Sequence, residues 1–253
     1  MGIDPETEFK EELQVFGNEV EEAMQCFYAE QAIHNVARGN TNVNQALNRN
    51  AAFWNLASRA LQANALIVLG RIFDKHSQAH GVDRLLHLAA KHRDIFSKTA
   101  LERRKRPHAG KWTDEFMRSA YVPTRRDFVR LQTYTDRQRA IYNGQYRVLR
   151  DKFIAHKERA DMTTAFANAS IPRLERLLVF LDQLQDALWH LFENGRKPVL
   201  RPARYSGKRI LKSPLPKGLH RNQAAQEWIT RETEKFLKYL GACYDGDGKQ
   251  GAR

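Results

Sequence analysis

Residues 51–73 read AAFWNLASRALQANALIVLGRIF, and the apolar side chains of this stretch surround the axis of the helix that it would form. A helix that is apolar on nearly every side is expected to be buried on most of them. The run from Ala60 to Leu69 is interrupted by Gln62 and Asn64 and is shorter than the roughly 20 residues that a membrane span requires. Residues 51–73 are therefore predicted to form the central helix of a soluble protein.

Apolar residues elsewhere also step by three and four, which is the spacing of amphipathic helices. Residues 9–39 are predicted to form one long helix that ends near Gly39, and residues 171–194 another, which starts at Ser170-Ile171-Pro172 and stops at Gly195. Three more helices are expected at residues 85–106, 113–120 and 125–157, the last capped by Thr124 and weakened by Gly144. No stretch alternates as a strand would, so the fold class is all-α, an up-and-down helical bundle.

The composition changes after Gly195, because no acid occurs from Asn194 to Gln226 while basic residues alternate with prolines. Residues 195–221 are therefore read as an extended basic arm. Residues 222–253 are expected to form a last helix, at about residues 222–240, and a disordered tail from residue 241. Residues 1–8 resemble a vector-derived leader, which leaves residues 9–194 as the bundle.

The formal net charge of +13 predicts attraction to polyanions. The two cysteines, Cys26 and Cys243, lie far apart in the chain, and no basic segment followed by an apolar one opens it. Both features favour a reduced, cytoplasmic setting.

One stretch suggests chemistry, residues 146–158, which read YRVLRDKFIAHKE. Arg150 is followed directly by an acid, Asp151, and the apolar residues 153–155 precede His156. Two other arginine–histidine pairs have similar spacing. Arg71 to His76 ends the apolar helix, where Arg71 is expected to pair with an acid, and Arg103 to His108 crosses a charged run into a proline.

The arginine, acid and histidine of residues 150–156 resemble the signature of the HEPN superfamily, which includes ribonucleases of toxin–antitoxin and phage-defence systems. Residues 69–75 (LGRIFDK) and 82–86 (VDRLL) are similar to the AbiU-type abortive-infection branch. The resemblance implies a HEPN bundle that is a homodimer, with the motif lining the cleft between its subunits. It implies catalytic roles for Arg150, His156 and Asp151, RNA as substrate, and an antitoxin protein as a candidate partner. Lys152, Lys157 and Arg147 are candidate RNA-binding residues.

RNA carries its own nucleophile, the 2′-hydroxyl group, so its cleavage needs a proton acceptor, a proton donor and positive charge near the phosphate. A histidine and an arginine supply these, so no metal or other cofactor is expected. On an unbroken helix Arg150 and His156 would lie about 120° apart. The helix could break, the arginine could reach around, or two subunits could share the site.

Other functions stay open at this point. The chain could be a non-catalytic HEPN module that binds RNA, nucleotide or a protein partner, or a helical scaffold in which Arg150 and Asp151 form a structural pair. His76 and His80 have the spacing of zinc ligands but lack a third ligand nearby.

Overall fold

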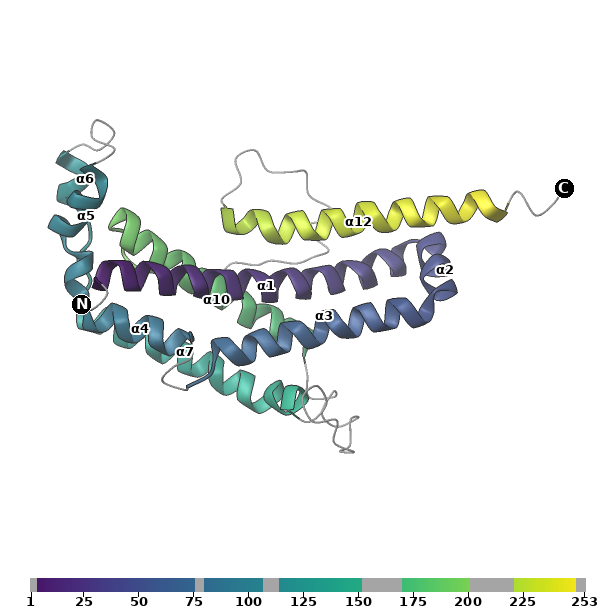
Figure 1. Ribbon diagram of the computed structural model, residues 1–253, viewed down its shortest axis with the longest axis horizontal. Coiled ribbons are helices and arrows are strands. Elements are labelled where there is room, and N and C mark those ends of the chain that lie inside the picture. Colours follow the sequence, from purple (N-terminus) through teal and green to yellow (C-terminus); the bar gives the residue numbers. More distant parts are fainter. Residues whose placement is uncertain (1–3, 76–79, 107–113, 152–169, 201–220, 249–253) are drawn as a thin grey trace. The chain divides into compact units, whose positions relative to one another are not determined.

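The computed structural model of the chain describes residues 4–75, 80–106, 114–151, 170–200 and 221–248. Every regular element within these residues is helical, which confirms the all-α expectation (Figure 1). The longer helices are α1 (Pro5–Gly39), α3 (Ala51–Ile72), α7 (Arg125–Gln145), α10 (Ile171–Asn194) and α12 (Arg221–Gly248). The shorter elements are α2 (Thr41–Arg49), α4 (Val82–Lys91), the 3₁₀ helix η1 (Arg93–Phe96), α5 (Lys98–Lys105), α6 (Asp114–Ser119) and α8 (Arg147–Leu149). Among the described residues, none of the helices has the length and apolar content needed to cross a membrane.

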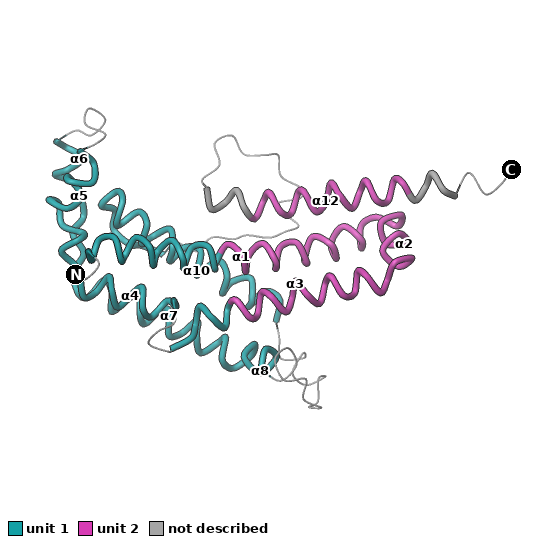
Figure 2. Tube along the Cα trace, viewed as in Figure 1, with its two compact units in different colours: residues 1–20, 69–203 teal, residues 21–68, 204–253 magenta. Residues whose placement is uncertain are grey.

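The chain divides into two compact units (Figure 2). Unit 1 comprises residues 1–20 and 69–203, and unit 2 comprises residues 21–68 and 204–253. The residues that carry the arginine motif all belong to unit 1.

The core of unit 1 contains a cluster of aromatic rings from four elements. The ring of Phe9 lies 5.2 Å from the rings of both Phe96 and Phe192, and Phe128 lies 5.6 Å from Phe96. Leucines of α10 complete this core with the predicted periodicity, and α10 ends at Gly195, whose φ of 56° is the left-handed conformation that favours glycine. The expected helix at residues 171–194 is therefore confirmed.

Acids of the first two turns of α1 bind arginines of unit 1. Glu6 forms ion pairs with Arg103 and Arg104, and Glu8 pairs with Arg84. Residues 5–8, which sequence reasoning set aside as a leader, are thus part of a helix that contacts the rest of the unit.

Two predicted helices of unit 1 are shorter than expected. The helix predicted over residues 85–106 is divided into α4, η1 and α5, because Ser97 caps a new helix by accepting a hydrogen bond from the backbone nitrogen of Ala100 (3.2 Å). The helix predicted over residues 125–157 ends at Gln145, one residue after the weak position Gly144. Its start is as predicted, since the backbone nitrogen and hydroxyl of Thr124 both donate to Asp127 (2.8 Å each).

In unit 2, residues of α1, α2 and α12 share a small apolar core of Ile33, Val36, Val43, Leu47 and Leu237. α12 continues past residue 240 to Gly248, so the tail expected to be disordered from residue 241 begins as a helix. The absence of a side chain at Gly241 lets α12 lie close to α2, because a β-carbon there would lie 2.9 Å from Cγ2 of Val43.

The prediction that residues 51–73 are buried on most sides is wrong for the first half of α3. Residues 65, 66, 68–70, 72 and 73 are buried, but Phe53 is 62% exposed and Leu56 is 67% exposed. Sequence composition alone does not distinguish a helix enclosed by neighbours from one with apolar residues on an open face.

Candidate active site

A break at Tyr146 positions the segment that carries the arginine motif. α7 ends before this residue and α8 begins after it, and Arg150 and Asp151 continue in a π-helical turn. The Tyr146 side chain is 2% exposed, and its hydroxyl group donates a hydrogen bond to the carbonyl oxygen of Ser170 (2.7 Å). A buried tyrosine therefore fixes the direction in which Arg150 leaves the helix.

Arg150 lies directly against the backbone of α3 at Gly70. A β-carbon built on Gly70 would lie 2.0 Å from Nη1 of Arg150 and 2.9 Å from its Cδ, far inside van der Waals contact. The arginine side chain is 27% exposed, so it is largely covered but remains accessible to a ligand. Glycine at position 70 is what gives the guanidinium group this position.

Asp151 binds the two arginines that flank it. Its Oδ1 accepts from Nε of Arg150 at 2.7 Å and lies 2.5 Å from Nη2, and its Oδ2 accepts from Nε of Arg147 at 3.3 Å. Burial acts to raise the pKa of Asp151, but the hydrogen bonds and charges of Arg150 and Arg147 outweigh it and hold the pKa below its usual range. The carboxylate is therefore ionised at neutral pH, and the three residues together carry one net positive charge.

Two aromatic residues lie beside this group. The ring of Tyr142 lies 5.4 Å from the ring of Phe73, and burial raises the pKa of Tyr142 to about 12. Arg150 acts in the opposite direction on that pKa and Asp151 in the same direction. Because Tyr142 stays a neutral phenol at physiological pH, it can take part in hydrogen bonding but does not serve as a base.

The pKa of Arg150 also reflects these neighbours. Burial acts to lower it, but Asp151, Tyr142 and the charge of Asp74 together raise it above its ordinary value. The guanidinium group is a permanent cation, as the stabilisation of a phosphate in the transition state requires.

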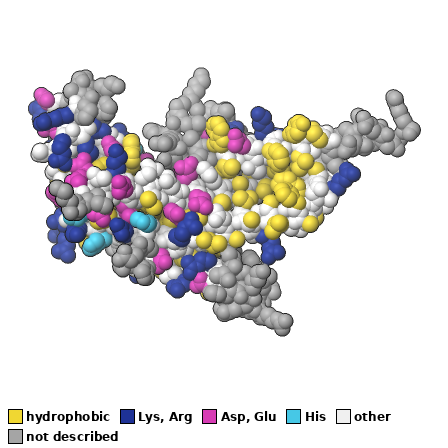
Figure 3. Space-filling model, in the orientation of Figure 1, with side chains coloured by type: hydrophobic (Ala, Val, Ile, Leu, Met, Phe, Trp, Pro, Cys, Tyr) yellow, Lys and Arg dark blue, Asp and Glu magenta, His cyan; other side chains and the backbone are white. Residues whose placement is uncertain are grey.

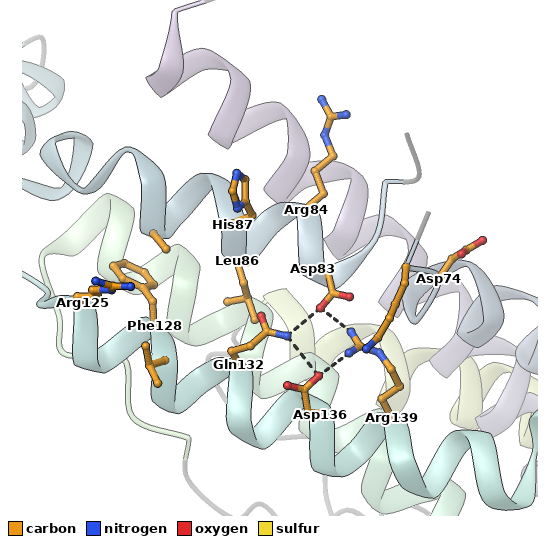
Figure 4. A pocket seen from close by; sticks show the side chains of 13 residues that line it. Asp74, Asp83, Arg84, Leu86, His87, Arg125, Phe128, Gln132, Asp136 and Arg139 are labelled. Atoms are coloured by element: carbon orange, nitrogen blue, oxygen red, sulfur yellow. Dashed lines mark hydrogen bonds and ion pairs between the residues drawn. The ribbon is translucent and has the colours of Figure 1, made fainter. Parts of the chain in front are cut away.

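A cavity of about 780 Å³ lies next to Asp74, between α4 and α7 (Figure 4). Asp83 of α4 accepts hydrogen bonds from Gln132 (2.8 Å) and Arg139 (2.6 Å) of α7, and Nη1 of Arg139 pairs with Asp136 (2.5 Å). Arg139 is 4% exposed. This polar network joins the two helices and forms one wall of the cavity.

Sequence reasoning missed Arg139 as part of the site. The available signals were Asp136, three residues earlier on the same helix, and Asp83, in a stretch singled out for its family resemblance. The guanidinium carbon of Arg139 lies 6.0 Å from the ring centre of Phe73, the ring that also contacts Tyr142. Residues 70–75 therefore connect the cavity with Arg150.

The predicted site residues Arg150, Asp151 and Arg147 are brought together. The other predicted residues, His156, Lys152 and Lys157, lie outside the described residues, so their positions relative to Arg150 stay a prediction. Asp74 lines the cavity between α4 and α7, and His76 lies outside the described residues.

The arginines of the other two arginine–histidine pairs form ion pairs within the fold. Arg71 pairs with Glu19 (2.8 Å), as expected, and Arg103 pairs with Glu6. His80 of the suggested zinc pair has its Nδ1 atom 2.9 Å from Glu12. Within the part of the chain that the structure describes, no three histidine, cysteine or acidic residues are grouped as metal ligands.

Comparison with known protein families matches residues 6–210 of the chain to the AbiU2 model of the HEPN superfamily. The match covers most of the chain and includes every residue of the candidate site. The comparisons with curated proteins and with solved structures gave no match.

Proposed function

Because the chain belongs to the AbiU2 family of HEPN proteins, we propose that it is an endoribonuclease that cleaves RNA through attack of the 2′-hydroxyl group, without a metal ion. It acts as a toxin or phage-defence effector. The observation that carries this proposal is the position of Arg150, a permanent cation held against Gly70 at an accessible surface, directly after a helix break.

In the proposed reaction His156 accepts the proton of the 2′-hydroxyl group while water protonates the leaving 5′-oxygen, or His156 protonates the leaving 5′-oxygen while water accepts the 2′-hydroxyl proton. A bond forms between the 2′-oxygen and phosphorus while the bond from phosphorus to the 5′-oxygen breaks. The products are a 2′,3′-cyclic phosphate and a free 5′-hydroxyl group, so atoms and charges balance without a cofactor.

Arg150 stabilises the negative charge that develops on the phosphate oxygens. Asp151 orients Arg150, since it engages the Nε and Nη2 atoms in the free protein. Arg147, Lys152 and Lys157 attract the RNA backbone. Two subunits of a homodimer share the site, with the arginine of one meeting the histidine of the other.

The first test is cleavage of RNA in EDTA by the wild-type protein and by Arg150→Ala and His156→Ala. Each substitution is expected to slow cleavage by at least about 100-fold, the usual effect of removing an acid–base group or a charge-stabilising donor. Arg137→Ala is the matched control, because Arg137 is an exposed arginine of α7 near Tyr134 and away from the cavity lining. Full activity of both site variants would reject the proposal.

The second test concerns sharing of the site. When inactive Arg150→Ala and His156→Ala chains are mixed and exchange subunits at random, half of the dimers contain both kinds of chain and one intact shared site. About a quarter of wild-type activity should therefore return. No recovery after verified subunit exchange would place both residues of each site in one chain.

The runner-up function is a non-catalytic HEPN module that binds RNA, nucleotide or a partner such as an antitoxin. The ion pair between Arg150 and Asp151 favours it, because a paired arginine can serve as a preformed binding contact. RNA binding that Arg150→Ala weakens, with the RNA recovered intact in every condition, would support this function over cleavage.

A further inference from the structure

The cavity between α4 and α7 of unit 1 combines apolar walls with charges of both signs. Its volume of about 780 Å³ is within the range of sites that hold small molecules. On the face drawn in Figure 3, basic and acidic side chains likewise lie close together over unit 1. Both helices supply apolar side chains to the cavity, namely Leu86, Ala90, Phe128 and Val129. A flat ring with hydrogen-bond donors and acceptors at its edge suits such a cavity.

Two carboxylates of the cavity each keep one oxygen for a ligand. Asp83 and Asp136 both pair with Arg139 through Oδ1, at 2.6 and 2.5 Å. The side-chain amide of Gln132 donates to the same two oxygens, at 2.8 and 3.4 Å (Figure 4). Within the described residues neither Oδ2 atom has a hydrogen-bond partner. A carboxylate accepts hydrogen bonds, so the part of a ligand that binds here must carry N–H or O–H donors.

Three basic side chains of the cavity wall, those of Lys75, His87 and Arg125, are unpaired. None of them forms an ion pair or hydrogen bond with a group that the structure describes. Arg125 is the first residue of α7, about 10 Å along the helix from Gln132, and it lies at the end of the cavity away from Asp136 (Figure 4). The distribution therefore fits a ligand that is neutral where it meets the acids and anionic where it meets Arg125.

Guanine is the RNA base whose edge matches the two acids. Its pairing edge carries two neighbouring donors, the ring N1–H and the exocyclic amino group, which one or two carboxylate oxygens can accept together. Adenine and cytosine place an acceptor nitrogen beside their amino group, and uracil has one ring N–H between two carbonyl groups. In those three bases an acceptor would lie against a carboxylate oxygen. Lys75 is a donor for the carbonyl oxygen of guanine.

The cavity lies within reach of an RNA strand that is bound at Arg150. The ring of Phe73 lies 6.0 Å from the guanidinium carbon of Arg139, in the cavity, and 5.4 Å from the ring of Tyr142, beside Arg150. Eleven residues separate Arg139 from Arg150, which corresponds to about 16 Å of helix. A strand with one phosphate at Arg150 can therefore place the base of a nearby nucleotide between α4 and α7.

We propose that this cavity is a base subsite, which binds an unpaired guanine of the RNA a few nucleotides from the bond that is cut. Asp83 and Asp136 accept its N–H groups, Gln132 and Arg139 hold the two acids in place, and Arg125 binds an adjoining phosphate. The acids determine specificity and take no part in the chemical step. The inference rests on the proposed function for the choice of RNA as the ligand.

The test measures binding of RNA that cannot be cut, so its result does not depend on cleavage. Hexamers with 2′-O-methyl groups lack the attacking hydroxyl group. One is all uridine, and the others carry guanosine, inosine, adenosine or cytidine at one central position. The full chain should bind the guanosine hexamer about 10-fold more tightly than the others, which is within the range of a bidentate base contact. Inosine should lose most of this preference, because it lacks the exocyclic amino group.

Asp136→Asn tests the acid while keeping the size of the side chain. An amide replaces one acceptor with a donor, so affinity for the guanosine hexamer should fall to that for the uridine hexamer, which should stay unchanged. Asp186→Asn is the matched control, because Asp186 is 55% exposed against 52% for Asp136 and lies 3.4 Å from His190 on its own helix, α10, outside the cavity lining. Arg125→Ala should weaken binding of every hexamer by the same factor, as loss of a phosphate contact does.

Equal affinity for all the hexamers, or a guanine preference that Asp136→Asn retains, would overturn the proposal. Free GMP that competes as strongly as the guanosine hexamer would assign the cavity to a free nucleotide and would also overturn the RNA subsite. The outcome for the proposed function is separate. A guanine preference in a protein that leaves ordinary RNA intact in EDTA would keep the subsite and reject cleavage, whereas cleavage without any guanine preference would do the reverse.

Discussion

Adding one methyl group to Gly70 should disable the candidate site without unfolding the protein. The β-carbon of an alanine at position 70 would lie 2.0 Å from Nη1 of Arg150, whereas the ordinary separation is about 3.5 Å. The guanidinium group must therefore move by about 1.5 Å. Misplacement of a reacting group by about 1 Å can cost 100-fold in rate, so Gly70→Ala is expected to slow RNA cleavage by about that factor.

The effect of Gly70→Ala on stability should be small, because two contributions oppose each other. Replacing glycine inside a helix by alanine stabilises the helix by about 0.5–1 kcal/mol. Moving Arg150 weakens its ion pair with Asp151, whose side chain is 37% exposed, and a pair so open to solvent contributes only about 0–1 kcal/mol. The free energy of unfolding should thus change by less than about 1 kcal/mol.

The matched control is Gly144→Ala. Gly144 also lies inside a helix, but a β-carbon there would have nothing within 4 Å outside its own helix. This variant should gain about 0.5–1 kcal/mol and cleave RNA at the wild-type rate. Cleavage is measured in EDTA, and stability by urea unfolding. Wild-type cleavage by Gly70→Ala would refute the reasoning, because it would mean that the position of Arg150 against Gly70 is irrelevant to activity.

Two further predictions concern buried charges of unit 1. Burial acts to raise the pKa of Asp127, but hydrogen bonds from Thr124 and Tyr121 lower it overall. The ionised Asp127 side chain therefore stabilises the fold above the unfolded pKa of about 3.9, and this stabilisation is lost as the pH falls through the folded pKa. Asp127→Asn should therefore unfold more easily than the wild type at pH 7, by about 1 kcal/mol for the lost cap, and the difference should shrink below about pH 4; a constant difference down to pH 2 would contradict this. Asp83→Ala should lower the free energy of unfolding by about 1–3 kcal/mol, because the buried Arg139 would lose its ion pair with Asp83. The loss is limited because Arg139 keeps its ion pair with Asp136. Urea unfolding measures this loss, with Asp114→Ala on α6 as the control, and a change below about 0.3 kcal/mol would show that the network contributes nothing.

Helix positions could largely be predicted from local signals. Pro172 and Gly195 mark the ends of α10, and Thr124 marks the start of α7, because caps depend on residues close in sequence. The interruption at Tyr146 was missed because it depends on a hydrogen bond to a residue 24 positions away. The interruption at Ser97 was missed although its signal is local, since Ser97 caps the backbone nitrogen of Ala100.

The candidate site was predicted in part for the same reason. Arg147, Arg150 and Asp151 are close in sequence, so their association follows from helical spacing. The contact between Arg150 and Gly70 joins residues 80 positions apart, and no periodic pattern indicates it. The exposure of Phe53 and Leu56 on α3 was likewise hidden, because the sequence of an apolar helix is similar whether neighbouring helices cover it or leave one side open.

The central claim is that Arg150 and His156 cleave RNA by using its 2′-hydroxyl group. It is tested most directly with a DNA oligonucleotide that contains a short run of ribonucleotides, incubated with the protein in EDTA. The wild-type protein should cut only beside a ribonucleotide and leave a 2′,3′-cyclic phosphate, and His156→Ala should cut at least about 100-fold more slowly. Cutting of the all-DNA strand, or an undiminished rate for His156→Ala, would contradict the claim.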